Sequence, residues 1–378
     1  MFDPEKIPEI QARIREETNR SSSLFDDIDS DVDSIRIGGV TTIQPTNTNM
    51  ISLVASDAGN NRLEFNPLML QVVRVVDSYG AEQFFDVISS STDTQDLSRR
   101  QFDSSGGPIT PLGLLMRDLG VSDLSSLSPM IPKNPTSSGW TIVYRDLCEW
   151  AVLYDLCNKE FASDTVILHD GLLRTKIFSK DLFVEMYRLI IAAIERTRLD
   201  RRRDLFVVGI AKHSEVLERY ALAMAMSEVF PSGAAQYAPI PMEMQQKVYK
   251  WAEYLRLPTD DEMDIEKPKF NMGEMYFVRF GPQSGDPVWT VDLLHGQKER
   301  AQKIFGSLLN DAQLGFPIAY YPQSLQEADA HAQIVDLDLA ILQDTMIDAV
   351  RSNVTPSKQA LFDAHRLALI DPAARRYT

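Results

Sequence analysis

The stretch Ile51-Ser-Leu-Val-Ala-Ser-Asp57-Ala-Gly is a short apolar run that ends on a lone carboxylate followed by small residues. A buried carboxylate is costly for stability alone, and small residues let backbone or ligand come close. The same design recurs at Thr165-Val-Ile-Leu-His-Asp170-Gly and, with a base in place of the acid, at Leu205-Phe-Val-Val-Gly-Ile-Ala-Lys212. Open α/β sheets commonly place their ligands at strand ends. The three runs therefore predict one charged cluster, with a metal site, at an edge of a sheet.

The segments around these runs predict the fold class. Residues 50–58 and 66–78 are rich in β-forming residues, and 81–91 gives a third strand, so an antiparallel meander is expected. From about residue 140, helical and strand patterns alternate, which implies parallel strands joined by right-handed crossovers. The alternating segments are a helix at 140–159, a strand at 165–169, a helix at 180–198, a strand at 205–211 and a helix at 214–229. This order predicts an α/β protein with a ribonuclease H-like mixed sheet and helical additions.

Later segments add a strand pair at 274–280 and 288–293, and helices at 296–310, 323–334 and 336–352 that would cover a sheet face. We expect three parts along the chain. Residues 1–45 hold an N-terminal helix and an acidic linker, 46–335 form the main domain, and 336–378 form a C-terminal helical segment. Within the main domain, residues 92–139 carry clusters of Ser, Pro and Gly and predict a loose insertion with one short helix at 111–118.

The N-terminal part has two features of its own. Ile7, Ile10 and Ile14 form one apolar stripe of the expected helix, which suggests docking on a partner. The acidic run at 26–33 lacks the turn glycine and the closing glutamate of a calcium loop, so we interpret it as a surface linker.

The composition limits the classes of function that the chain can have. With 378 residues, 44% of them hydrophobic, the chain can bury a large core, and no apolar run is long enough to span a bilayer, so a cytoplasmic protein is expected. The net charge of −16 opposes nonspecific attraction to nucleic acid. A nucleic-acid enzyme with this charge needs divalent ions, a basic partner or a local basic patch. The densest patch, at 196–203, is interpreted equally well as a solvated helix end.

Three acids are expected to converge at the sheet edge. Asp57 and Asp170 end strands, and Glu149 shares a helix face with Leu153 and Leu156, where a lone acid needs a partner. Together they offer enough oxygens to hold Mg²⁺ or Mn²⁺. Two such ions, roughly 4 Å apart, would activate a water and stabilise the leaving oxygen of a phosphodiester. For each acid alone, a cap, a turn or a paired surface charge is an equally good explanation.

Five short motifs in a fixed order resemble the NurA nuclease family over residues 46–335. They are Asp57-Ala-Gly after a strand, a helix bearing Glu149, Leu168-His-Asp170-Gly-Leu-Leu, Val208-Gly-Ile-Ala-Lys212-His-Ser214 and Tyr321-Pro-Gln-Ser-Leu325-Gln-Glu-Ala328-Asp. The resemblance implies a ribonuclease H-like, manganese-preferring nuclease that acts on DNA ends and single strands. It also implies a homodimer that works with a hexameric HerA-type ATPase, which pumps DNA into the nuclease. The biological setting, DNA repair or antiphage defence, stays open.

The family's site residues transfer position by position. Asp57 and Asp170 would be metal ligands, and Glu149 the helical carboxylate between them, although Asp146 lies one turn earlier on nearly the same face. Lys212 would lie near the scissile phosphate, or would be only a solvated charge. Tyr321 matches the tyrosine of the late Tyr-Pro motif, or is a half-buried aromatic residue.

One departure concerns the fourth ligand. The family pattern places a histidine where this chain has Asp329, and His331 lies two residues later. Asp and His both offer a metal-binding lone pair. We prefer Asp329, because His331 points about 200° away around a helix. The altered ligand and the acidic charge also leave room for an alternative, a catalytically silent adaptor of the same fold that docks on the ATPase ring.

Overall fold

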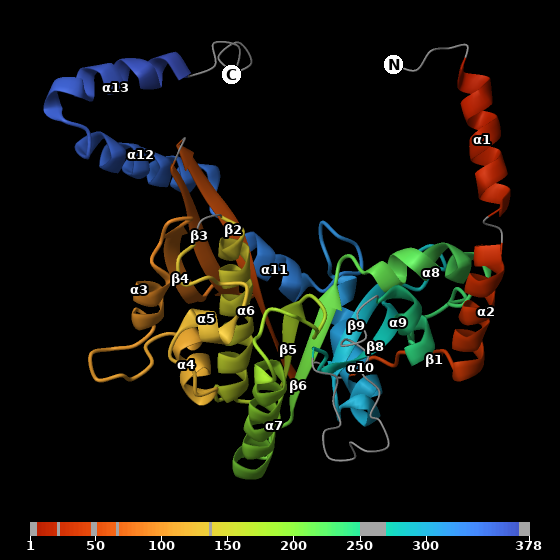
Figure 1. The fold of residues 1–378 in the computed structure, drawn as a ribbon. Helices are drawn as coiled ribbons and strands as arrows, with labels where there is room; N and C mark the ends of the chain where they lie inside the picture. The colour runs from red at the N-terminus through yellow and green to blue at the C-terminus, as the bar shows by residue number, and fades with distance from the viewer. Residues whose placement is uncertain are drawn as a thin grey trace.

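A computed structural model of the chain describes residues 6–20, 23–46, 51–65, 68–135, 138–249 and 270–369. At the centre of these residues lies one mixed sheet of nine strands in the order β1-β7-β8-β9-β6-β5-β2-β3-β4 (Figure 1). The strands are β1 (Thr41–Thr42), β2 (Ile51–Phe65), β3 (Leu68–Asp77), β4 (Glu82–Ser89), β5 (Asp164–Asp170), β6 (Leu205–Ala211), β7 (Gln236–Pro239), β8 (Gly273–Arg279) and β9 (Trp289–Leu294). A large mixed sheet with helices confirms the predicted α/β class.

The middle of the sheet brings the three quoted runs together. β2 pairs in parallel with β5, and β5 pairs in parallel with β6. Ser56 lies beside His169 in this register, so Asp57 and Asp170 come to the same level, where Lys212 follows β6. β3 and β4 continue the sheet beyond β2 as antiparallel strands, which confirms the predicted meander.

Helices cover both faces of this central region. One face packs against α6 (Trp140–Asn158) and α7 (Leu182–Arg201), with α4 (Pro111–Asp118) packed on α6, and the other face packs against α10 (Ala301–Gln313) and α11 (Gln323–Ala332). Ile167 of β5 belongs to the first core, whereas Val166 and Leu168 belong to the second. Side chains alternate along a strand, and a strand buried on both faces is therefore a continuous apolar run.

The interpretation of residues 26–33 as a linker is wrong. They lie in α2 (Ser23–Gly38), which packs on α8 (Glu215–Met226). Val32 and Ile35 are 0% and 1% exposed, and the Asp31 carboxylate accepts a hydrogen bond from the Tyr220 hydroxyl at 3.0 Å. Asp27, Asp29 and Asp33 are exposed, so the run is one side of an amphipathic helix, a pattern that the acid count concealed.

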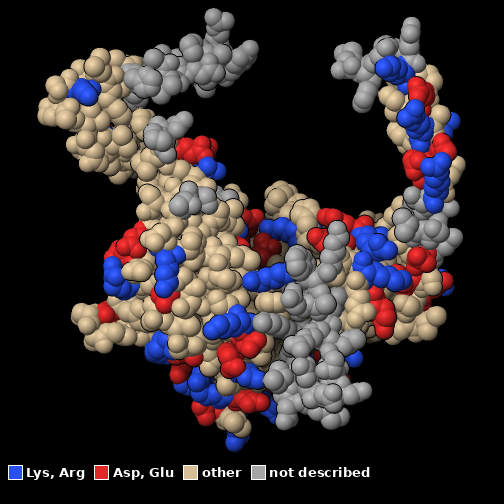
Figure 2. All heavy atoms as spheres, in the orientation of Figure 1, with Lys and Arg blue, Asp and Glu red and all other residues tan. Residues whose placement is uncertain are grey.

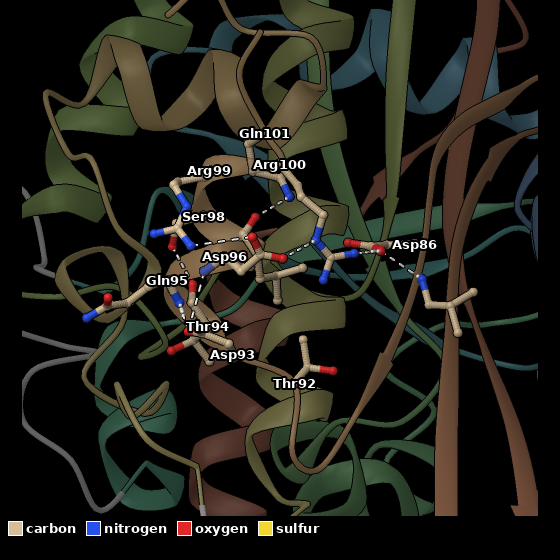
Figure 3. A network of polar contacts seen from close by, with 12 residues as sticks. Asp86, Thr92, Asp93, Thr94, Gln95, Asp96, Ser98, Arg99, Arg100 and Gln101 are labelled. Carbon is tan, nitrogen blue, oxygen red and sulfur yellow. Dashed lines mark hydrogen bonds and ion pairs between the residues drawn. The ribbon is translucent and has the colours of Figure 1, made fainter. Parts of the chain in front are cut away.

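The interpretation of residues 92–139 as a loose insertion is also wrong. The segment contains α3 (Thr94–Arg99), the expected α4 and α5 (Leu124–Leu127), and its Leu97, Leu112 and Leu124 are fully buried in the α6 core. Figure 3 shows how α3 is fixed, with the Asp93 carboxylate capping its first turn and Arg100 reaching Asp86 of β4 at 3.3 Å. Buried leucines and side-chain caps therefore order a segment whose turn residues suggested a loop.

The other helices mostly lie where they were expected. Ser214 occupies the N-cap position of α8, but its side chain makes no capping hydrogen bond. The remaining helices are α1 (Ile7–Arg20), α9 (Met242–Val248), α12 (Asp336–Ser352), α13 (Pro356–Leu369) and the short η4 (Lys298–Arg300). α1 extends away from the sheet (Figure 1), whereas α12 packs on β2 and β3, where Met346 joins Leu63 and Val72 in a small core cluster. Among the described residues, no helix combines the length and the apolar character needed to cross a bilayer.

Candidate functional site

Carboxylates from distant parts of the chain meet at the edge of the sheet where β5 and β6 end. Asp170 is the last residue of β5, Lys212 directly follows β6, and Asp329 lies on α11. The Lys212 ammonium is 2.8 Å from the Asp170 carboxylate and 3.3 Å from that of Asp329. Asp57 of β2 lies within hydrogen-bonding reach of Asp329. The structure therefore brings together side chains that are up to 272 positions apart, as 329 − 57 gives.

The Asp57 carboxyl is strongly perturbed by its surroundings. Burial, followed by the negative charges of Asp170 and Asp329, raises the pKa of Asp57 from 3.8 to about 7. The Ala58 backbone N–H donates a hydrogen bond to Asp57 Oδ1 at 2.7 Å and partly offsets this rise. The positive charge of Lys212 therefore does not offset the combined effect of burial, Asp170 and Asp329 on Asp57.

Lys212 and Asp329 respond in the opposite way. Burial alone would lower the pKa of Lys212, but the hydrogen bonds and charges of Asp170 and Asp329 raise it. Burial would raise the pKa of Asp329, but Lys212, Gln333 and Asp57 together lower it. At neutral pH, Lys212 is therefore a cation held between two carboxylates.

Tyr321 forms a hydrogen bond with the Asp170 oxygen that Lys212 does not contact. Its side chain is fully buried, and its hydroxyl lies 2.8 Å from Asp170 Oδ1 and 3.1 Å from the Ile210 carbonyl oxygen. Burial, followed by the charge of Asp170, raises the pKa of Tyr321 well above its usual value, so the group stays a phenol and donates. The Trp289 ring packs against it with centroids 4.9 Å apart. Tyr321 is thus a buried hydrogen-bond donor, which fixes the direction of the Asp170 carboxylate.

Glu149 approaches the same cluster from α6. Its side chain is 12% exposed, and burial, then Asp57 and Asp170, raises its pKa well above the usual value. Glu149 Oε1 lies 3.2 Å from His169 Nδ1, yet neither atom has the geometry of a hydrogen bond. Burial lowers the pKa of His169 to about 4, so the imidazole is neutral and packs on Trp150. The pair is therefore a close contact and not an ion pair.

Two alternatives from the sequence lie in different surroundings. Asp146 is half-buried and accepts from Arg145 at 2.8 Å, although its charge also acts on Glu149. His331 is exposed, and its ring lies beside Gly80 in the turn between β3 and β4. Of the two residues proposed as a fourth ligand, Asp329 is the one that faces Lys212.

A buried ion pair that the sequence analysis missed holds the loop after β5. Arg174 Nε and Nη2 donate to the two Asp292 oxygens at 2.9 and 3.0 Å, and the Leu173 N–H donates to Asp292 Oδ2 at 3.1 Å. The side chains of Arg174 and Asp292 are 4% and 0% exposed. The signal was available, because Val288-Trp-Thr-Val-Asp292-Leu is another apolar run with a lone carboxylate.

The donor set of the cluster suits a hard divalent cation. Asp57, Glu149, Asp170 and Asp329 supply carboxylate oxygens, the ligands that Mg²⁺ and Mn²⁺ favour, and the buried Glu149 Oε1 has no hydrogen-bond partner. Acidic and basic side chains lie together in the hollow between β2–β4 and α8 (Figure 2). Within the described ranges, however, no group of three or more His, Cys, Asp or Glu is already arranged to hold an ion. Lys212 stands between two of the carboxylates.

Comparison with known proteins gives structural matches alone. No protein-family model matches the chain, and no curated protein matches it. A crystal structure of the NurA nuclease from Sulfolobus solfataricus matches 94% of this chain and 99% of its own, with 12% identity and a TM-score of 0.47. A structure of NurA bound to dAMP and manganese matches 96% of this chain and 100% of its own, with 9% identity and a TM-score of 0.42.

The chain is similar to NurA nucleases. A third match is to a structure of NurA with manganese, at 9% identity and a TM-score of 0.38.

Proposed function

We propose that this protein is a divalent-metal-dependent nuclease that hydrolyses phosphodiester bonds in DNA. The observation that carries the proposal is the convergence of Asp57, Glu149, Asp170 and Asp329 on one sheet edge, beside a lysine and a buried tyrosine. Burial, followed by the neighbouring carboxylates, raises the pKa of Asp57, and such a concentration of acids is unfavourable for stability. An unfavourable cluster of this kind at a strand edge favours a functional role.

The four carboxylates would hold Mn²⁺ or Mg²⁺, with Asp329 in the place of the family histidine. When bound, the cation would stabilise the charge of the phosphate and activate a water molecule. We propose that two such cations act together. Tyr321 keeps the Asp170 carboxylate oriented through its 2.8 Å hydrogen bond. Lys212 provides a cation for the phosphate, and neutral His169 packs against Glu149 without competing for charge.

DNA as the substrate, with cleavage at ends and in single strands, follows from the NurA resemblance. The net charge of −16 supports a partner that supplies basic surface. We therefore include in the proposal a homodimer that works in the cytoplasm with a HerA-like hexameric ATPase, in DNA end processing for repair or antiphage defence.

The deciding experiment measures cleavage of a labelled oligonucleotide in Mn²⁺ buffer, with and without the ATPase. Asp57→Ala and Asp170→Ala are expected to lower the rate by about 100-fold or more, because both remove central carboxylates. Asp164→Ala is the matched control, because Asp164 also pairs with a lysine but lies at the opposite end of β5. Cleavage that persists in both site variants contradicts the proposal.

A catalytically silent adaptor is the second candidate. The observation that favours it is the ion pair of Lys212 with Asp329, the residue that replaces the family histidine. Calorimetry with Mn²⁺ separates the two candidates. A binding signal that disappears in Asp57→Ala supports the nuclease, and the absence of binding at millimolar Mn²⁺ supports the adaptor.

A further inference from the structure

Lys212 occupies the region that a cation bound to this cluster would need. Its ammonium lies 2.8 Å from Asp170 and 3.3 Å from Asp329, and its side chain is 26% exposed. A divalent ion bound to the same carboxylate oxygens would compete with the ammonium for their lone pairs and would repel its charge. The lysine and the ion therefore compete for Asp170 Oδ2 and Asp329 Oδ2.

A second lysine, Lys303 of α10, pairs with acids at the opposite ends of the same two strands. Lys303 lies 2.9 Å from Asp164, the first residue of β5, and 3.2 Å from Asp204, which precedes β6. Its side chain is 31% exposed, close to the value for Lys212. The two sites thus match in distances and exposure, which makes Lys303 an internal reference.

The two lysines differ in the charge around them. Lys303 faces two carboxylates, whereas the cluster at Lys212 adds Asp57 and Glu149 to Asp170 and Asp329. One ammonium faces two carboxyl groups at the first site and four at the second. The second site gains far more from exchanging its single charge for a divalent one.

We propose that Lys212 is a resident counter-ion of the carboxylate cluster, and that a divalent cation displaces it and releases its ammonium to the phosphate of the substrate. The inference deepens the proposed nuclease function and rests on it. Lys212 Nζ lies 5.5 Å from the centroid of the Tyr321 ring, and that ring stays fixed by its own hydrogen bonds. A released ammonium keeps this aromatic contact and remains beside the site.

The test compares Lys212→Met with Lys303→Met, because methionine keeps an unbranched chain without the charge. Isothermal titration calorimetry with Mn²⁺ alone, without DNA, measures the affinity of the full chain. Lys212→Met is expected to bind Mn²⁺ about tenfold more tightly than the wild type, the order that two partly exposed ion pairs imply. Lys303→Met is expected to leave the affinity unchanged. Equal or weaker binding by Lys212→Met overturns the inference.

A second measurement needs no variant. The acetylation rate of each lysine in the wild type, followed by mass spectrometry, is expected to rise severalfold with Mn²⁺ at Lys212 and to stay constant at Lys303. An unchanged rate at Lys212 overturns the inference even if Lys212→Met fails to fold. If the wild type cleaves DNA but neither change is seen, the inference about Lys212 fails and the nuclease proposal stands. If the changes are seen without cleavage, the nuclease proposal fails and the displacement of Lys212 by the cation stands. Absence of Mn²⁺ binding by both wild type and Lys212→Met refutes both.

Discussion

Replacing Asp57 with asparagine is expected to make the metal-free protein more stable while removing its response to Mn²⁺. The folded-state pKa of Asp57 is about 7, against 3.8 as the ordinary value. A tenfold change in an acid dissociation constant corresponds to about 1.4 kcal/mol, so the difference sets a ceiling of about 4 kcal/mol on the penalty of ionising this group. Because asparagine keeps an oxygen for the Ala58 N–H, we expect the variant to recover about half of that ceiling.

The effect has a defined pH dependence. The folded pKa is raised, so the wild type has no penalty below about pH 4, and the penalty grows between pH 4 and pH 7 and is complete above pH 7. The advantage of Asp57→Asn over the wild type therefore increases with pH. At pH 5 it should be about 40% of its value at pH 8.

Thermal unfolding in chelator-treated buffer measures this difference at pH 5 and pH 8. For a chain of this length, about 2 kcal/mol at pH 8 corresponds to a rise of roughly 3 °C in Tm. Added Mn²⁺ should then raise the Tm of the wild type and leave Asp57→Asn nearly unchanged. Asp164→Asn is the control with opposite sign: burial alone would raise the pKa of Asp164, but the Asp204 N–H and Lys303 lower it, so its loss should destabilise.

Two results would refute the reasoning. One is a Tm difference between Asp57→Asn and the wild type that is the same at pH 5 and pH 8. The other is an Asp57→Asn variant that is less stable than the wild type at pH 8. Either result would mean that burial and the neighbouring carboxylates do not raise the pKa of Asp57 in the folded protein.

Three further predictions concern the surroundings of the site. Tyr321→Phe removes a buried hydrogen bond and should cost about 1 kcal/mol in urea unfolding and weaken Mn²⁺ binding in calorimetry; unchanged binding would argue against an orienting role. Asp292→Asn leaves Arg174 buried without its ion pair and should cost about 3–5 kcal/mol in the same urea assay, and a loss smaller than about 1 kcal/mol would contradict the structure. Ile35→Asp buries a carboxylate under α2 and should lower stability by about 3 kcal/mol or more, whereas Ile37→Asp, at 87% exposure, should change little; equal Tm values would restore the linker interpretation.

The sheet was predictable from the sequence where strands are buried on both faces. Continuous apolar runs marked β5 and β6 to within a residue of their ends, and the meander before them was also found. Prediction was poorer where composition and periodicity disagree. In α2 the number of acids drew attention away from Val32 and Ile35, and at 92–139 the serines and prolines concealed leucines that tertiary packing buries.

In the candidate site, too, some residues could be predicted from the sequence and some contacts could not. Asp57, Asp170 and Lys212 could be predicted, because each follows an apolar strand and sheet geometry alone brings strand ends together. The contact of Glu149 with His169, and the ion pair of Arg174 with Asp292, join elements whose relative rotation the sequence does not encode locally. Such pairs depend on the packing of α6 and of the loop after β5, which only the full fold determines.

At two glycines near the site, the backbone of another segment approaches so closely that no side chain would fit. A methyl group on Gly59 would lie 2.1 Å from the backbone oxygen of Ala332, and one on Gly209 would lie 2.4 Å from that of Gly171. Two positions without any reactive group thus determine how close Asp329 comes to β2 and how low the segment after Asp170 rests on β6. A change from glycine to alanine at either one would separate the acids from one another, while every ionisable side chain remained in its place along the chain.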